Sequence, residues 1–157
     1  MAVGTVSSIN QDNWQLVQTN TPTSGTTSSF SSLSGYKTYM LVFNNINTAA
    51  SATYRIRFNS DTGNNYALLV NAGGSYLEGG SFFPLLGFVT TGPHSGYLLI
   101  NDANTTTPKR VELAGSYYVG GGAKGIYLGS SAVTSIEVSL NTSSFSSGTI
   151  SLYGIAA

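Results

Sequence analysis

Hydrophobic and polar residues alternate in short runs along most of the chain, which is the pattern of half-buried β-strands. The run ATYRIRF (52–58) has alanine, tyrosine, isoleucine and phenylalanine on one face, and threonine and two arginines on the other. The run TSIEVSL (134–140) alternates in the same way. No stretch repeats hydrophobic residues at helical spacing over three turns. The chain is therefore predicted to be all-β.

Nine runs of this kind are separated by turn-forming residues. They are WQLVQT (14–19), YKTYMLVFNNI (36–46), ATYRIRF (52–58), NYALLV (65–70), GYLLIND (96–102), KRVELAGSYYV (109–119), GIYLG (125–129), TSIEVSL (134–140) and GTISLYGI (148–155). Strands this short, without helices between them, favour sheet packed on sheet. We predict one jelly-roll-like antiparallel β-sandwich of eight or nine strands over residues 14–157, preceded by an N-terminal arm of residues 1–13.

The low charge content narrows the range of partners. Only 8% of the 157 residues are charged, and six basic and six acidic side chains give a net charge of zero. Nucleic-acid and membrane surfaces are bound by clusters of Lys and Arg, so neither is an expected partner. The chain has no cysteine for disulfide or thiolate chemistry, and we expect no cofactor. Its neutral surface, rich in hydroxyl and amide groups, favours association with other proteins.

The segment NSDTGNNY (59–66) is the densest group of potential ligand side chains, with Asn59, Asp61, Asn64, Asn65 and Tyr66. A tight turn explains this composition if Gly63 or Asn64 has positive φ and the Asn59 and Asp61 side chains cap backbone N–H groups. A sugar-binding loop is a second interpretation, because amides and an aromatic ring often hold saccharides. A calcium loop is the third, but an EF-hand needs glycine and glutamate where Asn64 and Val70 stand. We expect the turn and no metal.

An enzyme is not expected. His94 is the only histidine and lies in a turn-forming segment, and no G-x-S-x-G motif is present. The acidic residues share no motif that would pair two carboxyl groups for hydrolysis.

Three groups of residues could form subunit or capsid contacts. Arg55 and Arg57 lie on one strand face, where they could bind a carboxylate across a subunit boundary or simply be solvated. The hydrophobic segment around Pro84 either plugs one end of the sandwich or packs on another subunit. The third group is a segment in which tyrosines stand among glycines, and it could add a surface that adapts to another subunit or to the capsid. The candidates in these last two segments are Phe82, Phe83, Leu85, Leu86, Phe88, Tyr117, Tyr118 and Tyr127.

Three motifs in order resemble a module of tailed-bacteriophage virion proteins. They are SGYKTYMLVF (34–43), IRFNSDTGNNY (56–66) and the C-terminal FSSGTISLYGIA (145–156), preceded by VTSIEVSL. The resemblance covers roughly residues 14–155, with the middle diverged. It implies a jelly-roll-like sandwich in a tail fibre, a head fibre or a capsid decoration protein.

We expect a capsid decoration or cement protein, because only thirteen residues precede Trp14 and fibre proteins of this kind usually carry a long shaft or an attachment domain. The expected location is the virion, after synthesis in the host cytoplasm without a signal peptide. The expected partners are the major capsid protein and further copies of the chain, the resemblance implying a homotrimer. The alternative is a receptor-binding fibre or tail module that recognises a host-surface glycan.

Overall fold

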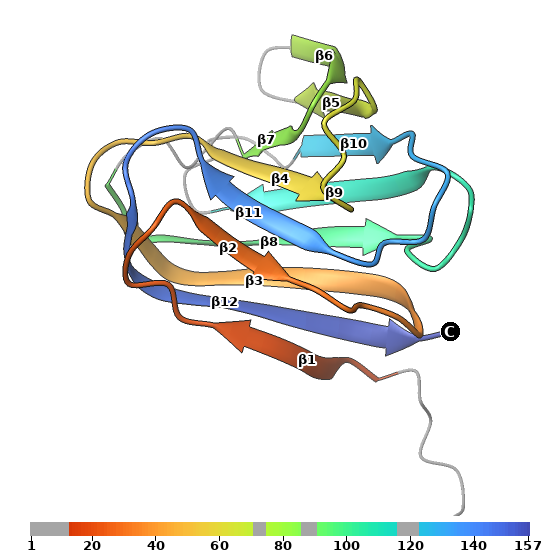
Figure 1. The fold of residues 1–157 in the computed structure, drawn as a ribbon, viewed down its shortest axis with the longest axis horizontal. Coiled ribbons are helices and arrows are strands. Elements are labelled where there is room, and N and C mark those ends of the chain that lie inside the picture. Colours follow the sequence, from red (N-terminus) through yellow and green to blue (C-terminus); the bar gives the residue numbers. More distant parts are fainter. Residues whose placement is uncertain (1–12, 71–74, 86–90, 116–122) are drawn as a thin grey trace, which may run out of the picture.

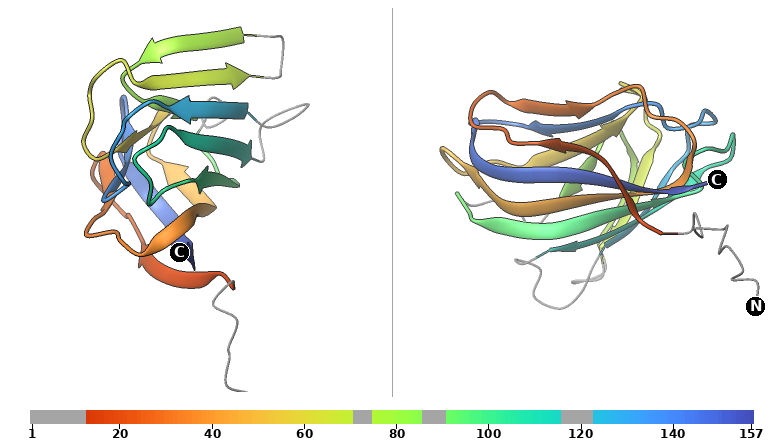
Figure 2. Two further views of the ribbon diagram at one scale, coloured as in Figure 1. Left: turned by 90° about the vertical axis from the view of Figure 1, so that its right-hand side faces the viewer. Right: turned by 90° about the horizontal axis from the view of Figure 1, so that it is seen from below.

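The chain folds into two antiparallel β-sheets packed face to face (Figures 1 and 2). The structure is a computed structural model that describes residues 13–70, 75–85, 91–115 and 123–157. The large sheet has the strand order β1-β12-β3-β8-β9-β10-β5-β6, and the small sheet has the order β2-β11-β4-β7. The predicted all-β sandwich is therefore confirmed.

The strands of the large sheet are β1 (Gln15–Asn20), β12 (Phe145–Ala156), β3 (Tyr36–Thr48), β8 (His94–Asn101), β9 (Lys109–Gly115), β10 (Ala123–Tyr127), β5 (Tyr66–Val70) and β6 (Ser75–Gly80). Those of the small sheet are β2 (Thr27–Phe30), β11 (Ile136–Leu140), β4 (Tyr54–Phe58) and β7 (Phe83–Leu85).

The core lies between the sheets and follows the two-residue period of the strands. In β3, Tyr39, Leu41 and Phe43 are at most 2% exposed, and the residues between them are only partly buried. In β4 the alternate residues 54, 56 and 58 are completely buried. Side chains of this size each contribute about 1.5–3 kcal/mol on burial, so the alternation seen in the sequence decides which face of each strand points inward.

The described residues form twelve strands, whereas the sequence pattern predicted eight or nine. The additional strands are β2, β6 and β7. The strands β2 and β7 were missed because pairing with a distant strand creates them: Phe30 of β2 lies opposite Ile136 of β11, and Pro84 of β7 lies opposite Arg55 of β4. Proline is tolerated there because β7 is a short edge strand. The strand β6 pairs with its sequence neighbour β5.

The first and third sequence motifs meet in the sheet. The ring of Tyr36 packs over Gly154 of the LYG sequence, and a Cβ atom on Gly154 would lie 2.4 Å from that ring. The same ring lies 5.5 Å from that of Tyr39. Glycine at position 154 thus leaves the space in which the Tyr36 ring closes over β12.

Lys109 is a polar centre inside the apolar sandwich. Its side chain is completely buried, and its ammonium group donates to the carbonyl oxygens of Thr105 at 2.9 Å, Thr107 at 2.7 Å and Gly129 at 3.2 Å. Burial lowers the pKa of Lys109, while the nearby Asp102 carboxylate opposes that shift. One side chain thus anchors the loop before β9 and the segment after β10.

Replacing Lys109 with methionine is expected to lower the free energy of unfolding by about 2–4 kcal/mol, because three carbonyl groups lose their donor. Urea unfolding followed by circular dichroism measures this loss. Lys124→Met is the matched control, since the Lys124 side chain is 67% exposed and its ion pair with Glu112 lies on the surface. Equal, small effects of both changes would contradict the anchoring role of Lys109.

Candidate interaction surface

The segment between β4 and β5 carries the chain from the small sheet to the large one. It begins with a β-turn in which the Asp61 N–H donates to the Phe58 carbonyl at 2.9 Å. Both central residues of this turn, Asn59 and Ser60, have φ of 55°. The expectation of positive φ at Gly63 or Asn64 was therefore wrong, because the reversal comes directly after β4 and asparagine tolerates the left-handed conformation.

The Asp61 carboxylate is surrounded by donors from this segment and from β10. It accepts from the Gly63 N–H at 2.7 Å, the Asn65 amide at 2.8 Å and the Tyr127 hydroxyl at 2.8 Å. The bond from Asn65 contributes most to lowering the pKa of Asp61, partial desolvation opposes it, and the bonds from Gly63 and Tyr127 add to the lowering. Donors from the crossover and from β10 thus hold the carboxylate in place.

The Asn59 side chain ties the same segment to the residues before β11. Its carbonyl oxygen accepts from the backbone N–H groups of Thr134 at 2.8 Å and Ser135 at 3.2 Å. Its amide donates to the carbonyl of Ala132 at 2.8 Å. Asn59 and Asp61 therefore cap backbone N–H groups, as the turn interpretation of the sequence required.

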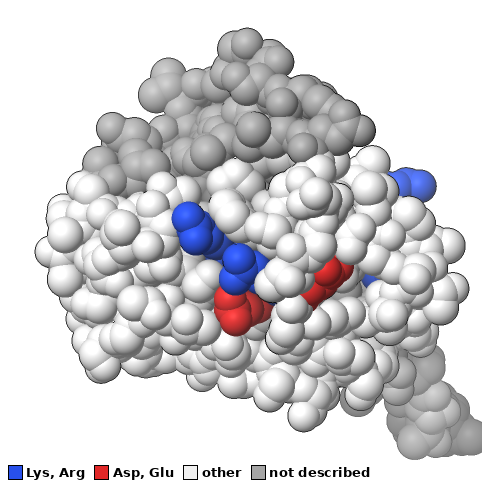
Figure 3. Space-filling model, turned by 45° about the horizontal axis from the view of Figure 1, so that its top comes forward, with Lys and Arg blue, Asp and Glu red and all other residues white. Residues whose placement is uncertain are grey.

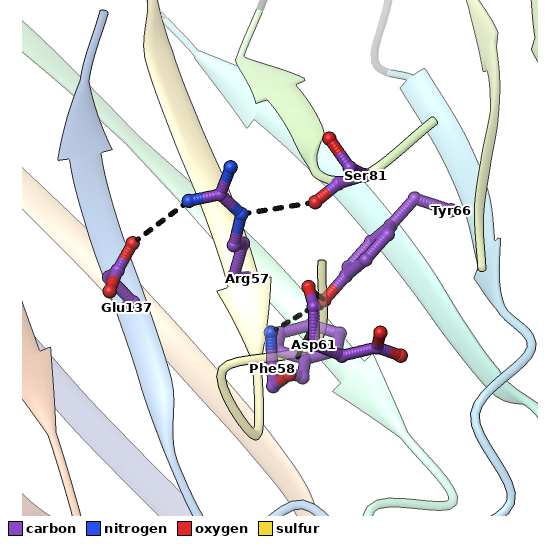
Figure 4. A network of polar contacts seen from close by, with 6 residues as sticks. All are labelled: Arg57, Phe58, Asp61, Tyr66, Ser81 and Glu137. Carbon is purple, nitrogen blue, oxygen red and sulfur yellow. Dashed lines mark hydrogen bonds and ion pairs between the residues drawn. The ribbon is translucent and has the colours of Figure 1, made fainter. Parts of the chain in front are cut away.

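Four aromatic rings pack beneath Asp61, from Phe58, Tyr66, Phe83 and Tyr127. Phe58 meets Tyr127 edge-on at 5.3 Å, and Tyr66 meets Phe83 edge-on at 5.0 Å. The Tyr66 hydroxyl accepts from the Phe58 N–H at 3.0 Å and lies 3.1 Å from the Asp61 carbonyl (Figure 4). Burial raises the pKa of Tyr66 to about 12, so the hydroxyl keeps its proton for this bond. Strands of both sheets thus share one polar and aromatic junction.

The sequence suggested a surface position for the Tyr127 ring, and it left two positions open for the Phe83 ring, the end of the sandwich or a subunit contact. Tyr127 is 3% exposed, so its ring belongs to the core and does not offer the adaptable surface contact that its glycine neighbours suggested. Phe83 is completely buried, which fits the interpretation that the hydrophobic segment fills one end of the sandwich. Gly125 makes room for it, because a Cβ atom there would lie 2.8 Å from the Phe83 ring.

Arg55, Arg57 and Phe82 form a compact cluster on the outer face of the small sheet, which we call the arginine surface. The guanidinium carbons of Arg55 and Arg57 lie 4.6 Å and 5.7 Å from the centre of the Phe82 ring. Both contacts are within the range of cation–π attraction. On this side of the molecule, basic and acidic groups gather on an otherwise uncharged surface (Figure 3).

The two arginines differ in their partners. Arg57 pairs with Glu137 of β11 at 3.5 Å and donates through Nε to the Ser81 carbonyl at 3.1 Å (Figure 4). The Nε atom of Arg55 is buried and has no hydrogen-bond partner among the described residues. Arg57 is thus neutralised within the chain, whereas Arg55 is held over an aromatic ring with hydrogen-bonding capacity to spare.

The remaining predicted site residues are dispersed or lie outside the described part of the chain. Asn64 is exposed beside the crossover, and Leu85 belongs to β7. The positions of Leu86, Phe88, Tyr117 and Tyr118 fall outside the described residues.

Glu137 and Ser81 were not predicted as part of the site. The alternation of TSIEVSL did place Glu137 on an outer face of its strand. Its position directly opposite Arg57 follows only from the pairing of β4 with β11.

Other side chains that could serve catalysis or metal binding form no second site within the described ranges. His94 is 3% exposed and its ring meets that of Tyr54 edge-on at 6.1 Å, inside the core. Among the described residues, no three His, Cys, Asp or Glu side chains come together as a metal site would require. That same part of the chain contains no helix with the length and hydrophobicity needed to cross a membrane.

A comparison with protein-family models finds no match. A comparison with curated proteins finds none either.

Asp61→Asn tests the junction. The free energy of unfolding near pH 7 is expected to fall by about 1–3 kcal/mol, because the donors of Asn65 and Tyr127 lose a charged acceptor. The pKa of Asp61 is lower in the folded protein than in the unfolded chain. Its contribution is therefore complete above about pH 4 and is lost as pH falls through the folded value.

Urea titrations between about pH 7 and about pH 2.5 measure both effects. The Asp61→Asn variant should lose less stability on acidification than the unchanged protein. Tyr127→Phe is the control, since it removes one donor and leaves the carboxylate to titrate. Identical acid sensitivity of Asp61→Asn and the unchanged protein would contradict the role of Asp61.

Proposed function

We propose that this protein is a structural protein of a tailed-bacteriophage virion, most specifically a capsid decoration or cement subunit that docks on the assembled shell. The three ordered motifs support this proposal, as does the neutral surface, which carries little charge repulsion against close packing of many copies. The sandwich is suited to such a role, because side-chain hydrogen bonds such as those of Asn59 and Asp61 join its two sheets.

The observation that carries the docking proposal is the state of Arg55. Its guanidinium group is fixed over Phe82, and its buried Nε lacks a partner among the described residues. An acidic side chain of the shell protein would pair with the charge of this guanidinium group, with Phe82 as the neighbouring hydrophobic contact. Because the ring already restrains the arginine, little side-chain entropy is lost on binding.

Docking would stabilise the shell by mass action. A ligand that binds only the assembled state contributes RT ln(1 + [L]/Kd), which is about 2.7 kcal/mol per site when the free concentration is a hundred times Kd. Many copies on one shell would multiply this modest contribution. The proposal therefore requires only moderate affinity at each arginine surface.

Arg55→Gln tests this role on particles that lack the protein. Binding of the purified variant is expected to be about 10–100-fold weaker, because a charge-assisted hydrogen bond contributes about 1.5–3 kcal/mol. Arg110→Gln is the matched control, since Arg110 is an exposed arginine on the large sheet. Equal binding of both variants would overturn the docking surface.

Quantitative mass spectrometry of separated heads and tails tests the location. The decoration role requires many copies on heads and none on isolated tails. Copies confined to tails would overturn it and would favour a second function, a receptor-binding module for a host glycan. That alternative is supported by an open groove of about 520 Å³ beside β1 and β2, lined by uncharged residues that are mainly hydroxyl and amide: Thr19, Asn20, Thr21, Pro22, Thr23, Ser24, Thr27, Ser28 and Ser29.

A further inference from the structure

The strands β1 and β2 end their sheets at the same side of the sandwich and line the open groove of about 520 Å³ (Figure 1). A groove of this size is within the usual range for sites that bind small molecules. Its nine lining residues are all uncharged, and seven of them carry a hydroxyl group. We call it the hydroxyl groove. Thr21, Thr23, Ser24 and Thr27 are exposed, so a ligand in the groove can reach their hydroxyl groups.

Asn20 is held in one orientation beside this groove. Its side-chain oxygen accepts from the Gln18 amide at 2.9 Å. Its amide nitrogen donates to the Ser28 hydroxyl and to the Ser29 carbonyl, both at 3.0 Å. These bonds connect β1 of the large sheet with β2 of the small sheet. Polar groups that are already fixed on strands lose little entropy when a ligand binds to them.

A row of uncharged side chains leads from the groove across the outer face of the large sheet. Thr19 of the groove lies opposite Ser151, Ser151 lies opposite Val42, and Val42 lies opposite Tyr97. Residues that lie directly opposite one another in antiparallel strands point to the same face. The hydroxyl groups of Thr19 and Ser151 are 3.0 Å apart, as this arrangement requires.

Tyr97 adds an exposed aromatic ring to this row. Its sequence neighbour Leu98 is completely buried, whereas Tyr97 is 44% exposed and therefore points away from the core. The next residue of the row, Ala114 in β9, has only a methyl side chain. Thr19 and Tyr97 are three strands apart, which is about 14 Å. The groove and the ring are thus parts of one uncharged surface.

The chemistry of this surface favours an uncharged oligosaccharide. The hydroxyl groups of a saccharide donate and accept hydrogen bonds as those of serine and threonine do, and its C–H faces can pack on an aromatic ring. A charged ligand would find no opposite charge in the groove or along the row from Thr19 to Tyr97. A hydrophobic ligand would bury hydroxyl groups without giving them a partner, which is unfavourable.

An added peptide strand is the other kind of ligand that the edge of a sheet can bind. Such a strand needs a continuous series of free backbone groups. The Ser29 carbonyl of β2 already accepts from Asn20, and a bulge interrupts the pairing of β1 between Leu16 and Gln18. Bulges and covered edges are features that prevent strand addition. This edge is therefore better suited to a ligand that bonds to side chains.

We infer that this protein binds an uncharged oligosaccharide, which lies in the hydroxyl groove and extends past Thr19 and Ser151 onto the ring of Tyr97. The inference goes beyond the docking role, and it gives the second function a site and a class of ligand. Thr27 of the groove lies two strands from Arg55, about 10 Å away. Affinity at one site is expected to be about millimolar, because bonds to hydroxyl groups replace bonds to water with little net gain.

A titration of the full chain followed by NMR tests the site and the ligand class. Maltohexaose, mannohexaose and chitotetraose are the uncharged probes, and hexagalacturonate is the charged one. At least one uncharged probe is expected to shift the amide signals of the groove and of Tyr97, and the charged probe should shift them less. No shift with any uncharged probe, shifts confined to other parts of the chain, or larger shifts with the charged probe would overturn the inference.

The hexapeptide QLVQTN, which has the sequence of β1, is the probe for strand addition. It is expected to leave the signals of β1 and β2 unchanged. If this peptide alone shifts them, the edge is a peptide site and the saccharide inference is wrong.

Variants test the two halves of the surface separately. Tyr97→Ala is expected to weaken saccharide binding about five- to tenfold, whereas Tyr97→Phe keeps the ring and should bind nearly as well as the unchanged protein. Ile126→Ala is the matched control, since Ile126 is 45% exposed on β10 of the same sheet. Thr23→Val removes one hydroxyl group of the groove and should weaken binding about three- to tenfold. Equal binding by Tyr97→Ala, Thr23→Val and the control would overturn the site.

Arg55→Gln separates this inference from the docking role. That variant should keep its saccharide affinity even where its binding to particles is lost, and Thr23→Val should keep its particle affinity. Circular dichroism checks that each variant folds. An unchanged protein that binds particles but no uncharged probe would overturn this inference alone. Loss of saccharide binding in Arg55→Gln would overturn a groove site that is separate from the arginine surface.

Discussion

The structure depends on the constraint that the chain must pass from one sheet to the other between β4 and β5. A crossover of only seven residues leaves its backbone groups outside any strand ladder, and each of them needs a partner. The Asp61 carboxylate meets this need by accepting from the crossover itself and from Tyr127 of the large sheet. Asn59 does the same toward the segment before β11. Two short polar side chains thus connect both sheets at one point.

The aromatic rings beneath this crossover make it rigid. Phe58 and Phe83 come from the small sheet, and Tyr66 and Tyr127 come from the large one, so their contacts join the two layers directly. Tyrosine is used where a hydroxyl must reach the polar layer above the core, and phenylalanine where no partner is available. Four residues of the segment that resembled a ligand site in sequence, Asn59, Asp61, Asn65 and Tyr66, thus help to hold the sandwich together.

The outer faces of the two sheets carry different kinds of side chain. On the small sheet, Arg55 and Arg57 are held by the ring of Phe82, which gathers charge in a protein that has very little of it. On the large sheet, Met40 and Leu99 lie opposite one another and are partly buried. The outer faces differ from the core because each strand displays alternate residues on opposite faces.

The sequence by itself determined the fold class and the faces of most strands. Alternation with a period of two is local, so the inward side of ATYRIRF and TSIEVSL could be read without knowing their neighbours. It also favoured a turn in the segment 59–66, because asparagine, aspartate and glycine have specific backbone preferences.

Only the tertiary structure decided which strands are neighbours, and with that the composition of every surface. Contacts between residues far apart in the chain pair Arg57 with Glu137, bury Tyr127 and create the strands β2 and β7. Such contacts depend on register between distant strands. A period of two decides which face of the sheet a side chain points to, but it does not decide which side chain lies opposite it on the next strand.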